Sequence, residues 1–158
     1  MVRNDTETVE AVSITRTVEI AAAVPQVWAA VTRSELIACW FGDQCEFDAR
    51  PGGQGSFGWT EHGVSVPVEV IEVEESTRIS FHWANEPGGD LSEGHRTTVT
   101  FELEEIDGGT RLTVTETGFD LLAGDAAYRT KAWAGNVEGW RDELAELVAF
   151  APSVELAA

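Results

Sequence analysis

The residue best placed for chemistry is a glutamate that falls in a hydrophobic strand pattern. Leu112, Val114 and Glu116 alternate along residues 110–118, so Glu116 shares the inward face of that predicted strand. A carboxylate placed there must be paired, hydrogen-bonded or neutral, because burying it without a partner is costly. An unpaired Glu116 in apolar surroundings would have a raised pKa and could act as a general acid or base. A paired Glu116 would be a fixed anion that orients a ligand.

Arg16 is the second unusual polar residue. It lies on the apolar face of the alternating segment 12–20, together with Val12, Ile14, Val18 and Ile20. Arg16 and Glu116 are therefore the two candidates for a polar anchor inside the domain.

Other chemical motifs carry weaker signals. Residues 53–58 match the glycine pattern of a dinucleotide-binding loop, but the following residues, Trp59, Thr60 and Glu61, continue a strand where that loop requires a helix. The three histidines, at positions 62, 82 and 95, lack a metal-ligand spacing, and the sequence does not tell whether they meet in space. Cys39 and Cys45 are predicted to be buried free thiols. We expect no cofactor, no metal site and no identifiable catalytic residue.

Aromatic side chains are frequent on the expected inner surface. Large aromatic residues fill cores and also line apolar ligand pockets, so both roles stay open for most of them. Trp28 and Trp140 fall in strong helical stripes and are predicted to be plain core. The predicted cavity lining consists of Trp40, Phe57, Trp59, Phe81, Trp83, Phe101, Glu116, Trp133 and Val137.

The elements that must position these residues can be read from the hydrophobic periodicity. Two short helices are predicted between residues 23 and 42, the first begun by Pro25 and the second capped by Ser34. A long helix is predicted over about 125–150; its glycines at 135 and 139 indicate either close packing or open space. A β-bulge is expected near Val70, where the alternation changes phase. The predicted strands are 12–20, 44–49, 54–60, 64–73, 78–83, 96–106 and 110–118.

Length, charge and composition limit the kinds of protein that this chain can be. The chain has 158 residues and a formal net charge of −18, with Lys131 as its one lysine. So acidic a protein repels nucleic acid and anionic membranes. Neither a membrane-spanning apolar run nor a signal-peptide core is found, so a cytoplasmic protein is expected. We expect one domain over 12–151, with a flexible acidic tail at 1–11 and a flexible tail at 152–158.

Five stretches of the sequence resemble a known family. They are VEIAAAVPQVWAAVTRSELIACWFG at 18–42, FDARPGGQGSF at 47–57, VIEVEESTRISFHW at 70–83, VTFELEEIDGGTRLTVTETGF at 99–119 and GWRDELAELVAF at 139–150. Together they resemble the family named for the activator of the heat shock protein 90 ATPase, within the START-like, birch-pollen-allergen-like (SRPBCC) helix-grip superfamily. The resemblance covers about residues 12–150 and carries no shared catalytic set.

The resemblance implies an α+β helix-grip fold. Its curved antiparallel sheet has six or seven strands, two short helices follow the first strand, and the long C-terminal helix crosses the concave face. The first and last strands are neighbours in such a sheet, so we expect Arg16 to pair with Glu116.

Three classes of function follow from these observations. The first is a binding protein whose cavity between sheet and helix holds an apolar or amphipathic small molecule. The second is an enzyme of the cyclase, dehydratase or hydrolase kind that uses a cavity carboxylate. The third is a chaperone-associated interaction protein. The sequence does not decide whether the protein is an enzyme, although the binding role is favoured, and it leaves monomer and homodimer open.

Overall fold

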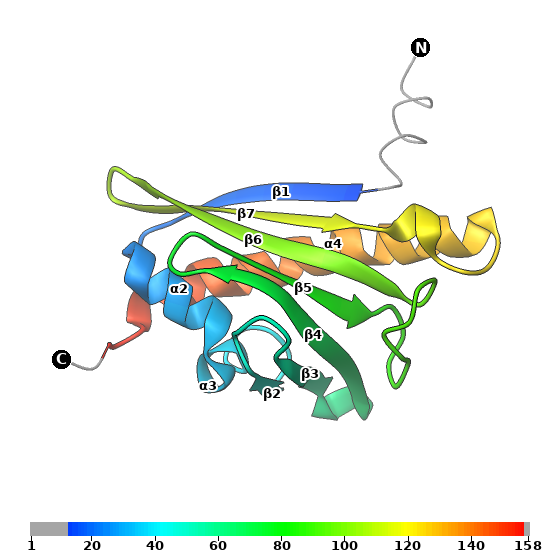
Figure 1. The fold of residues 1–158 in the computed structure, drawn as a ribbon. Coiled ribbons are helices and arrows are strands. Elements are labelled where there is room, and N and C mark those ends of the chain that lie inside the picture. Colours follow the sequence, from blue (N-terminus) through cyan, green and yellow to red (C-terminus); the bar gives the residue numbers. More distant parts are fainter. Residues whose placement is uncertain (1–12, 157–158) are drawn as a thin grey trace, which may run out of the picture.

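The computed structural model describes residues 13–156, which form one antiparallel sheet and three α-helices (Figure 1). The seven strands stand in the order β1-β7-β6-β5-β4-β3-β2. The strands are β1 (Ser13–Ile20), β2 (Gln44–Phe47), β3 (Gln54–Trp59), β4 (Val64–Glu74), β5 (Arg78–Ala84), β6 (Arg96–Ile106) and β7 (Gly109–Thr117). The helices are α2 (Val24–Thr32), α3 (Ser34–Ile37) and α4 (Ala126–Phe150), with short 3₁₀ turns η1 (Thr60–His62), η2 (Phe119–Leu121) and η3 (Ala151–Ser153). The predicted helix-grip fold is confirmed.

The sheet follows from the period-two alternation of its strands. In β7, buried and partly exposed residues alternate from Thr110 to Glu116, as expected for a sheet with one covered face. The expected bulge is present, because the pairing of β4 with β5 shifts between Val70 and Glu72. This bulge keeps apolar residues of β4 inward on both sides of the shift.

Helix ends are set by local chemistry. Pro25 lies in the first turn of α2, where its missing N–H costs nothing, and Asp125 caps α4 by accepting a hydrogen bond from the Tyr128 backbone at 2.8 Å. The predicted cap at Ser34 is wrong. Ser34 is the first residue of α3, and its hydroxyl bonds the backbone of Phe47, tying α3 to β2.

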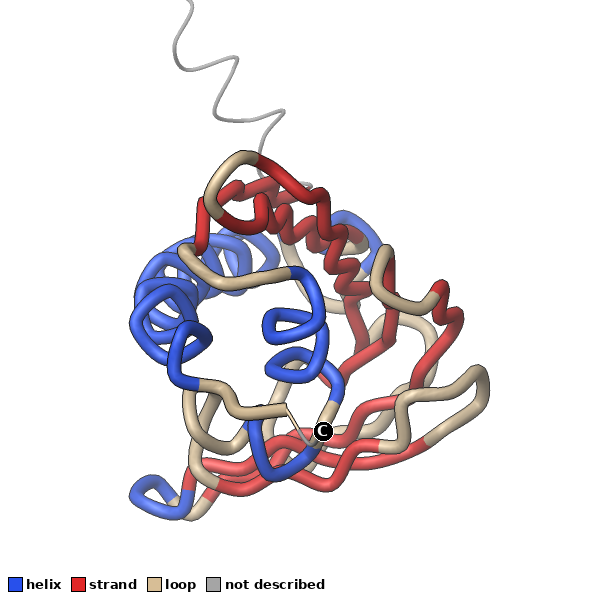
Figure 2. Tube along the Cα trace, turned by 90° about the vertical axis from the view of Figure 1, so that its left-hand side faces the viewer, coloured by secondary structure: helices blue, strands red, loops and turns tan. Residues whose placement is uncertain are grey.

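The sheet curves around the helices. Figure 2 looks along the molecule and shows the strands wrapping from the top to the bottom of the view, with α4 on the open side. In Figure 1, α4 runs along the sheet, and α2 and α3 lie at one end. Buried residues of the strands and of α4 form one hydrophobic core between them.

The C-terminal segment is partly packed against the domain. The predicted flexible tail at 152–158 begins with packed residues, since Val154 is buried and the Gln26 amide donates to its carbonyl at 3.1 Å. The predicted tail at 1–11 lies outside the described residues, as do residues 157–158. Over 13–156, no helix is long and apolar enough to cross a membrane.

Candidate functional site

A fully buried carboxylate joins the sheet to α4. Glu116 of β7 is 0% exposed, as its inward phase predicts. Its Oε1 accepts from the Trp140 indole at 2.8 Å and from the Asn136 amide at 3.1 Å. Its Oε2 accepts from the Trp83 indole at 3.0 Å, the Thr97 hydroxyl at 2.5 Å and the Asn136 amide at 2.9 Å. Three strands and one helix thus meet at one side chain.

Burial and hydrogen bonding shift the pKa of this carboxylate in opposite directions. Burial raises the pKa of Glu116 above its ordinary value of 4.5, while the hydrogen bonds from Thr97, Trp140, Trp83 and Asn136 act to lower it. The net direction is upward. Indole and amide N–H groups can only donate, so their arrangement suits an ionised carboxylate better than a protonated one.

The predicted pairing of Glu116 with Arg16 is wrong. Arg16 stands opposite Val114 in the β1–β7 ladder, and the residue opposite Glu116 is Ile14. Within residues 13–156, Arg16 forms no ion pair or hydrogen bond with Glu116. The carboxylate is satisfied by neutral donors instead, so no buried cation is needed.

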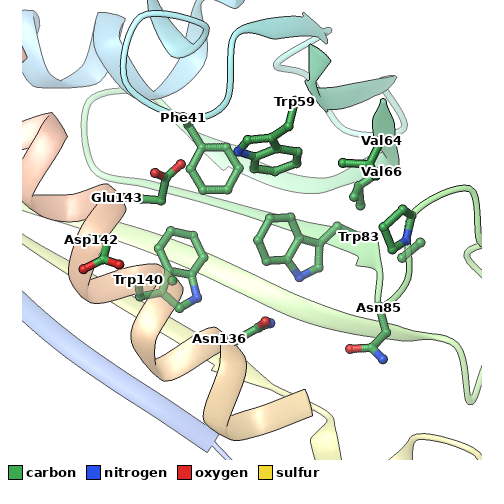
Figure 3. A pocket seen from close by; sticks show the side chains of 13 residues that line it. Phe41, Trp59, Val64, Val66, Trp83, Asn85, Asn136, Trp140, Asp142 and Glu143 are labelled. Atoms are coloured by element: carbon green, nitrogen blue, oxygen red, sulfur yellow. The ribbon is translucent and has the colours of Figure 1, made fainter. Parts of the chain in front are cut away.

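A pocket of about 400 Å³ lies between α4 and strands β3–β5 (Figure 3). Three of its lining residues, Trp83, Asn136 and Trp140, donate to Glu116. The pocket's aromatic wall consists of Phe41, Trp59, Trp83 and Trp140, and Val64 and Val66 of β4 extend it. Its volume falls within the range of small-molecule sites. The lining residues are Phe41, Trp59, Val64, Val66, Trp83, Ala84, Asn85, Pro87, Asn136, Gly139, Trp140, Asp142 and Glu143.

The aromatic wall is built from rings that support one another. The ring centroids of Phe41, Trp83 and Trp140 lie 5.6–5.7 Å apart, with interplanar angles of 23–27°. Trp59 meets Phe41 edge-on at 5.3 Å. Two of these rings, Trp83 and Trp140, also donate to Glu116, so the buried carboxylate fixes the orientation of the pocket wall.

Two amide and two carboxylate side chains line the pocket, those of Asn85, Asn136, Asp142 and Glu143. The Asn136 amide nitrogen donates to both oxygens of Glu116, and Asn85 donates to the Tyr128 hydroxyl at 2.8 Å. The Glu143 carboxylate is half-buried and accepts from the Gly42 backbone N–H at 3.3 Å. Burial, above all, raises the pKa of Glu143; the hydrogen bond from Gly42 acts to lower it, and the neighbouring carboxylates of Glu146 and Asp142 raise it further.

A second hollow of about 380 Å³ adjoins the pocket and shares Trp59, Asp142 and Glu143 with it. We call it the acidic vestibule, because most of its ionisable side chains are carboxylates; His62 is its one imidazole. Its lining consists of Cys39, Trp40, Gly42, Asp43, Trp59, Glu61, His62, Asp142, Glu143 and Glu146.

The residues predicted to line the cavity fall into separate groups. Trp59 and Trp83 line the pocket. Trp40, Phe57, Phe81 and Phe101 surround a space of only about 10 Å³, no larger than one water molecule needs, and so form packed core. Glu116 lies behind the pocket wall.

Two predicted lining residues lie on another part of α4. Trp133 is half-buried and donates to the Ser13 carbonyl at 2.8 Å, while Val137 packs against the core. Neither belongs to the pocket lining.

Several residues that build the site are not among the predicted site residues. Trp140 was predicted to be plain core, and its apolar stripe gives no hint that its N–H bonds a carboxylate. Asn136 lies one helical turn before Trp140, and this i, i+4 spacing of two donors on one face is the signal that could have found it. Glu143 continues the same face, three residues further on.

The remaining motifs have structural roles. Residues 54–58 of the glycine-rich segment lie within strand β3, and no α-helix directly follows them. The prediction that Thr60 and Glu61 continue the strand is wrong, because they belong to the 3₁₀ turn η1. The prediction of buried thiols is wrong for Cys39, which is exposed on the turn after α3, and Cys45 is half-buried. Among residues 13–156, no three His, Cys, Asp or Glu side chains are grouped closely enough to hold a metal ion.

Comparison with known structures supports the fold. A protein from Mesorhizobium loti, MLL2253, superimposes with a TM-score of 0.74 at 23% identity, covering 91% of this chain and 99% of that one. Ms6760 from Mycobacterium smegmatis gives 0.70 at 22% identity, covering 93% and 94%. The Aha1 dimer from Colwellia psychrerythraea gives 0.70 at 17% identity, covering 90% and 97%. At these identities the likeness concerns the fold alone.

Comparison of sequences identifies the family. No curated protein matches the chain. Residues 21–151, which include α2, every strand from β2 to β7 and all of α4, match the family described as activator of Hsp90 ATPase homolog 1-like protein. The chain therefore belongs to the activator of Hsp90 ATPase homolog 1-like family.

Proposed function

We propose that this protein binds a small amphipathic molecule in the pocket between α4 and strands β3–β5. The observation that carries the proposal is the combination of volume and lining: about 400 Å³, walled by aromatic and aliphatic side chains, with a few polar groups at defined positions. Ligand sites in proteins share this composition. The apolar part of the ligand would contact Phe41, Trp83 and Trp140, and its polar part would face Glu143.

A glycine on α4 supports the proposal. Gly139 lines the pocket, and a Cβ built at this position meets no atom within 4 Å. A glycine in a helix interior costs about 1 kcal/mol relative to alanine. Since a side chain at this position would meet no neighbouring atom, close packing does not account for the glycine. The absence of a side chain leaves space in the pocket, which we take as its role.

The test uses this glycine and a matched one. N-phenyl-1-naphthylamine, a neutral fluorescent probe, is titrated into the wild type, Gly139→Leu and Gly135→Leu. Gly135 is also helical and open, but it is not part of the pocket lining. We expect Gly139→Leu to weaken probe binding at least about tenfold, because its side chain fills the site, and Gly135→Leu to leave binding unchanged.

Two results would contradict the proposal. If the wild type binds no probe, or if both leucine variants bind it equally, the pocket is not the binding site. Native mass spectrometry of freshly purified protein complements the titration, because a copurified ligand would be identified by its mass.

A second candidate function comes from the family description. The family is named for activation of the Hsp90 ATPase, and one structural neighbour is an Aha1 dimer. Stimulation of a purified Hsp90 ATPase by this protein, together with failure of every probe to bind, would favour that chaperone-associated role.

Glu116, the carboxylate predicted for the enzymatic alternative, is not accessible to a molecule in the pocket. Glu116 is 0% exposed and lies behind Trp83, Asn136 and Trp140, so it has no direct contact with a molecule in the pocket. Glu143 is the carboxylate at which proton transfer to a bound molecule would have to occur.

A further inference from the structure

We infer that the pocket selects an organic cation: an aromatic or aliphatic body that carries an ammonium group. This inference rests on the proposed function and goes further, because it assigns the charge of the ligand. Three features of the pocket carry it: the use of its hydrogen-bond donors, the faces of its rings and the sign of its charges.

The first feature is that the pocket offers few free donors. The indole N–H groups of Trp83 and Trp140 are bonded to Glu116, and the Asn136 amide nitrogen donates to both oxygens of the same carboxylate. The half-exposed Trp59 indole is the remaining aromatic N–H on the wall. An anionic or acceptor-rich ligand loses hydrogen bonds to water when it binds, and it needs donors in the pocket to replace them. The indole donors of Trp83 and Trp140 are not available for this, because they are bonded to Glu116.

The second feature is the arrangement of ring faces. Because Trp83 and Trp140 direct their N–H edges to Glu116 behind the wall, a bound molecule meets their carbon surfaces (Figure 3). Aromatic faces carry negative electrostatic potential and attract ammonium groups, and tryptophan does so most strongly. Phe41 and Trp59 add two further rings to the same wall.

The third feature is charge. Within the described residues, the lining of the pocket contains the carboxylates of Asp142 and Glu143 and no Lys, Arg or His. The acidic vestibule beside it adds further carboxylates, and the whole chain carries a formal charge of −18. An approaching cation is therefore attracted both over a distance and at the mouth of the pocket, whereas an anion is repelled.

The test uses three probes that share one aromatic body. They are (2-naphthylmethyl)trimethylammonium, its neutral isostere 2-neopentylnaphthalene, and the anion 2-naphthylacetate, each measured by displacement of N-phenyl-1-naphthylamine. We expect the cation to bind about tenfold more tightly than the neutral isostere, from contact with the rings and attraction to Glu143, and the anion to bind most weakly.

A pair of charge variants locates the effect. Glu143→Gln removes a carboxylate from the pocket, and Glu102→Gln removes one from the exposed side of β6, so both change the net charge equally. We expect Glu143→Gln to weaken binding of the cation about three- to tenfold and to leave the neutral isostere unaffected. Glu102→Gln should change neither.

The outcomes separate this inference from the proposed function. If the neutral isostere or the anion binds as tightly as the cation, the charge assignment is overturned while the binding function stands. If Glu143→Gln and Glu102→Gln weaken the cation equally, bulk charge and not the pocket provides the selectivity, which also overturns the assignment. If no probe and no N-phenyl-1-naphthylamine binds, the proposed function itself fails.

Discussion

The Glu116 carboxylate shows how a buried charge can be accommodated without a cation. It receives hydrogen bonds from two indoles, an amide and a hydroxyl, so its oxygens are satisfied although the side chain is fully buried. Such donors carry no charge that would itself need to be removed from water, so the desolvation penalty falls on one ion instead of two. The site depends on the number of donors and on their placement.

The first prediction concerns replacement of this residue. Whichever way a glutamine amide turns at position 116, its NH₂ group meets N–H donors, those of Trp140 and Asn136 on one side or those of Trp83 and Asn136 on the other. We therefore expect Glu116→Gln to lower the free energy of unfolding by about 1–3 kcal/mol at mildly acidic pH, measured by urea denaturation.

This difference should depend on pH with a definite sign. The pKa of Glu116 is raised in the folded protein, so the wild type loses stability as pH rises from the ordinary value of 4.5 through the folded pKa, while the variant lacks this loss. The stability difference between them should therefore narrow as pH rises. Effects of other acids, including Glu143, are common to both proteins and cancel.

Arg16 provides the control for the predicted ion pair. Arg16→Gln should change the free energy of unfolding by less than about 0.5 kcal/mol and add independently to Glu116→Gln, because the two side chains are not paired. A coupling above about 1 kcal/mol would contradict the hydrogen-bond network described above.

Among the elements, β2 and β3 form the edge that positions part of the aromatic wall. Phe57 of β3 packs against Phe41 at 5.1 Å, and Phe41 in turn lines the pocket. The approach of the two strands depends on Gly55, where an added Cβ would lie 1.9 Å from the Glu46 carbonyl oxygen. The atom that the Cβ would meet belongs to the backbone, so the contact cannot be relieved by turning a side chain.

The second prediction follows from that contact. Gly55→Ala should separate β2 from β3 and lower the free energy of unfolding by about 1–3 kcal/mol, as overpacked sites do. The neighbouring Ser56→Ala, which keeps the strand backbone in place, should stay within about 0.5 kcal/mol of the wild type in the same denaturation experiment. Equal stability of both variants would mean that the strands can part without cost.

For the whole molecule, the dominant property is charge. With 28 acidic and 10 basic side chains, the folded protein repels itself, and its ion pairs, such as Arg111 with Glu19 and Glu104, are exposed. Exposed pairs contribute little, so salt should weaken them less than it relieves the repulsion.

The third prediction tests this balance. The free energy of unfolding should increase as sodium chloride is raised from about 0.01 M to about 0.15 M, where the screening length falls from about 30 Å to about 8 Å. Sucrose at the same osmolality serves as the uncharged control. A decrease in stability with salt would mean that attractive pairs outweigh the repulsion.

How much of this molecule is predictable from sequence depends on the range of the interactions. Period-two alternation placed Glu116 inward, because a strand's faces are a local property. Its partners were not predictable, since Thr97, Trp83 and Asn136 come from three other elements and meet only when the register of the sheet is fixed. Aromatic type alone likewise could not separate Phe57 and Phe81, which fill core, from Trp83, which walls a pocket.

The order of synthesis gives the buried carboxylate a further consequence. Two of its four donor residues, Asn136 and Trp140, belong to α4, which is synthesised after every strand of the sheet. Without α4, Glu116 lacks these two donor residues, and the part of the sheet that α4 covers is uncovered. A charge within an apolar strand opposes intermolecular β-pairing, so we expect Glu116 to protect the unfinished chain against aggregation. Docking of the last helix then converts that protective charge into the bonded centre of the folded protein.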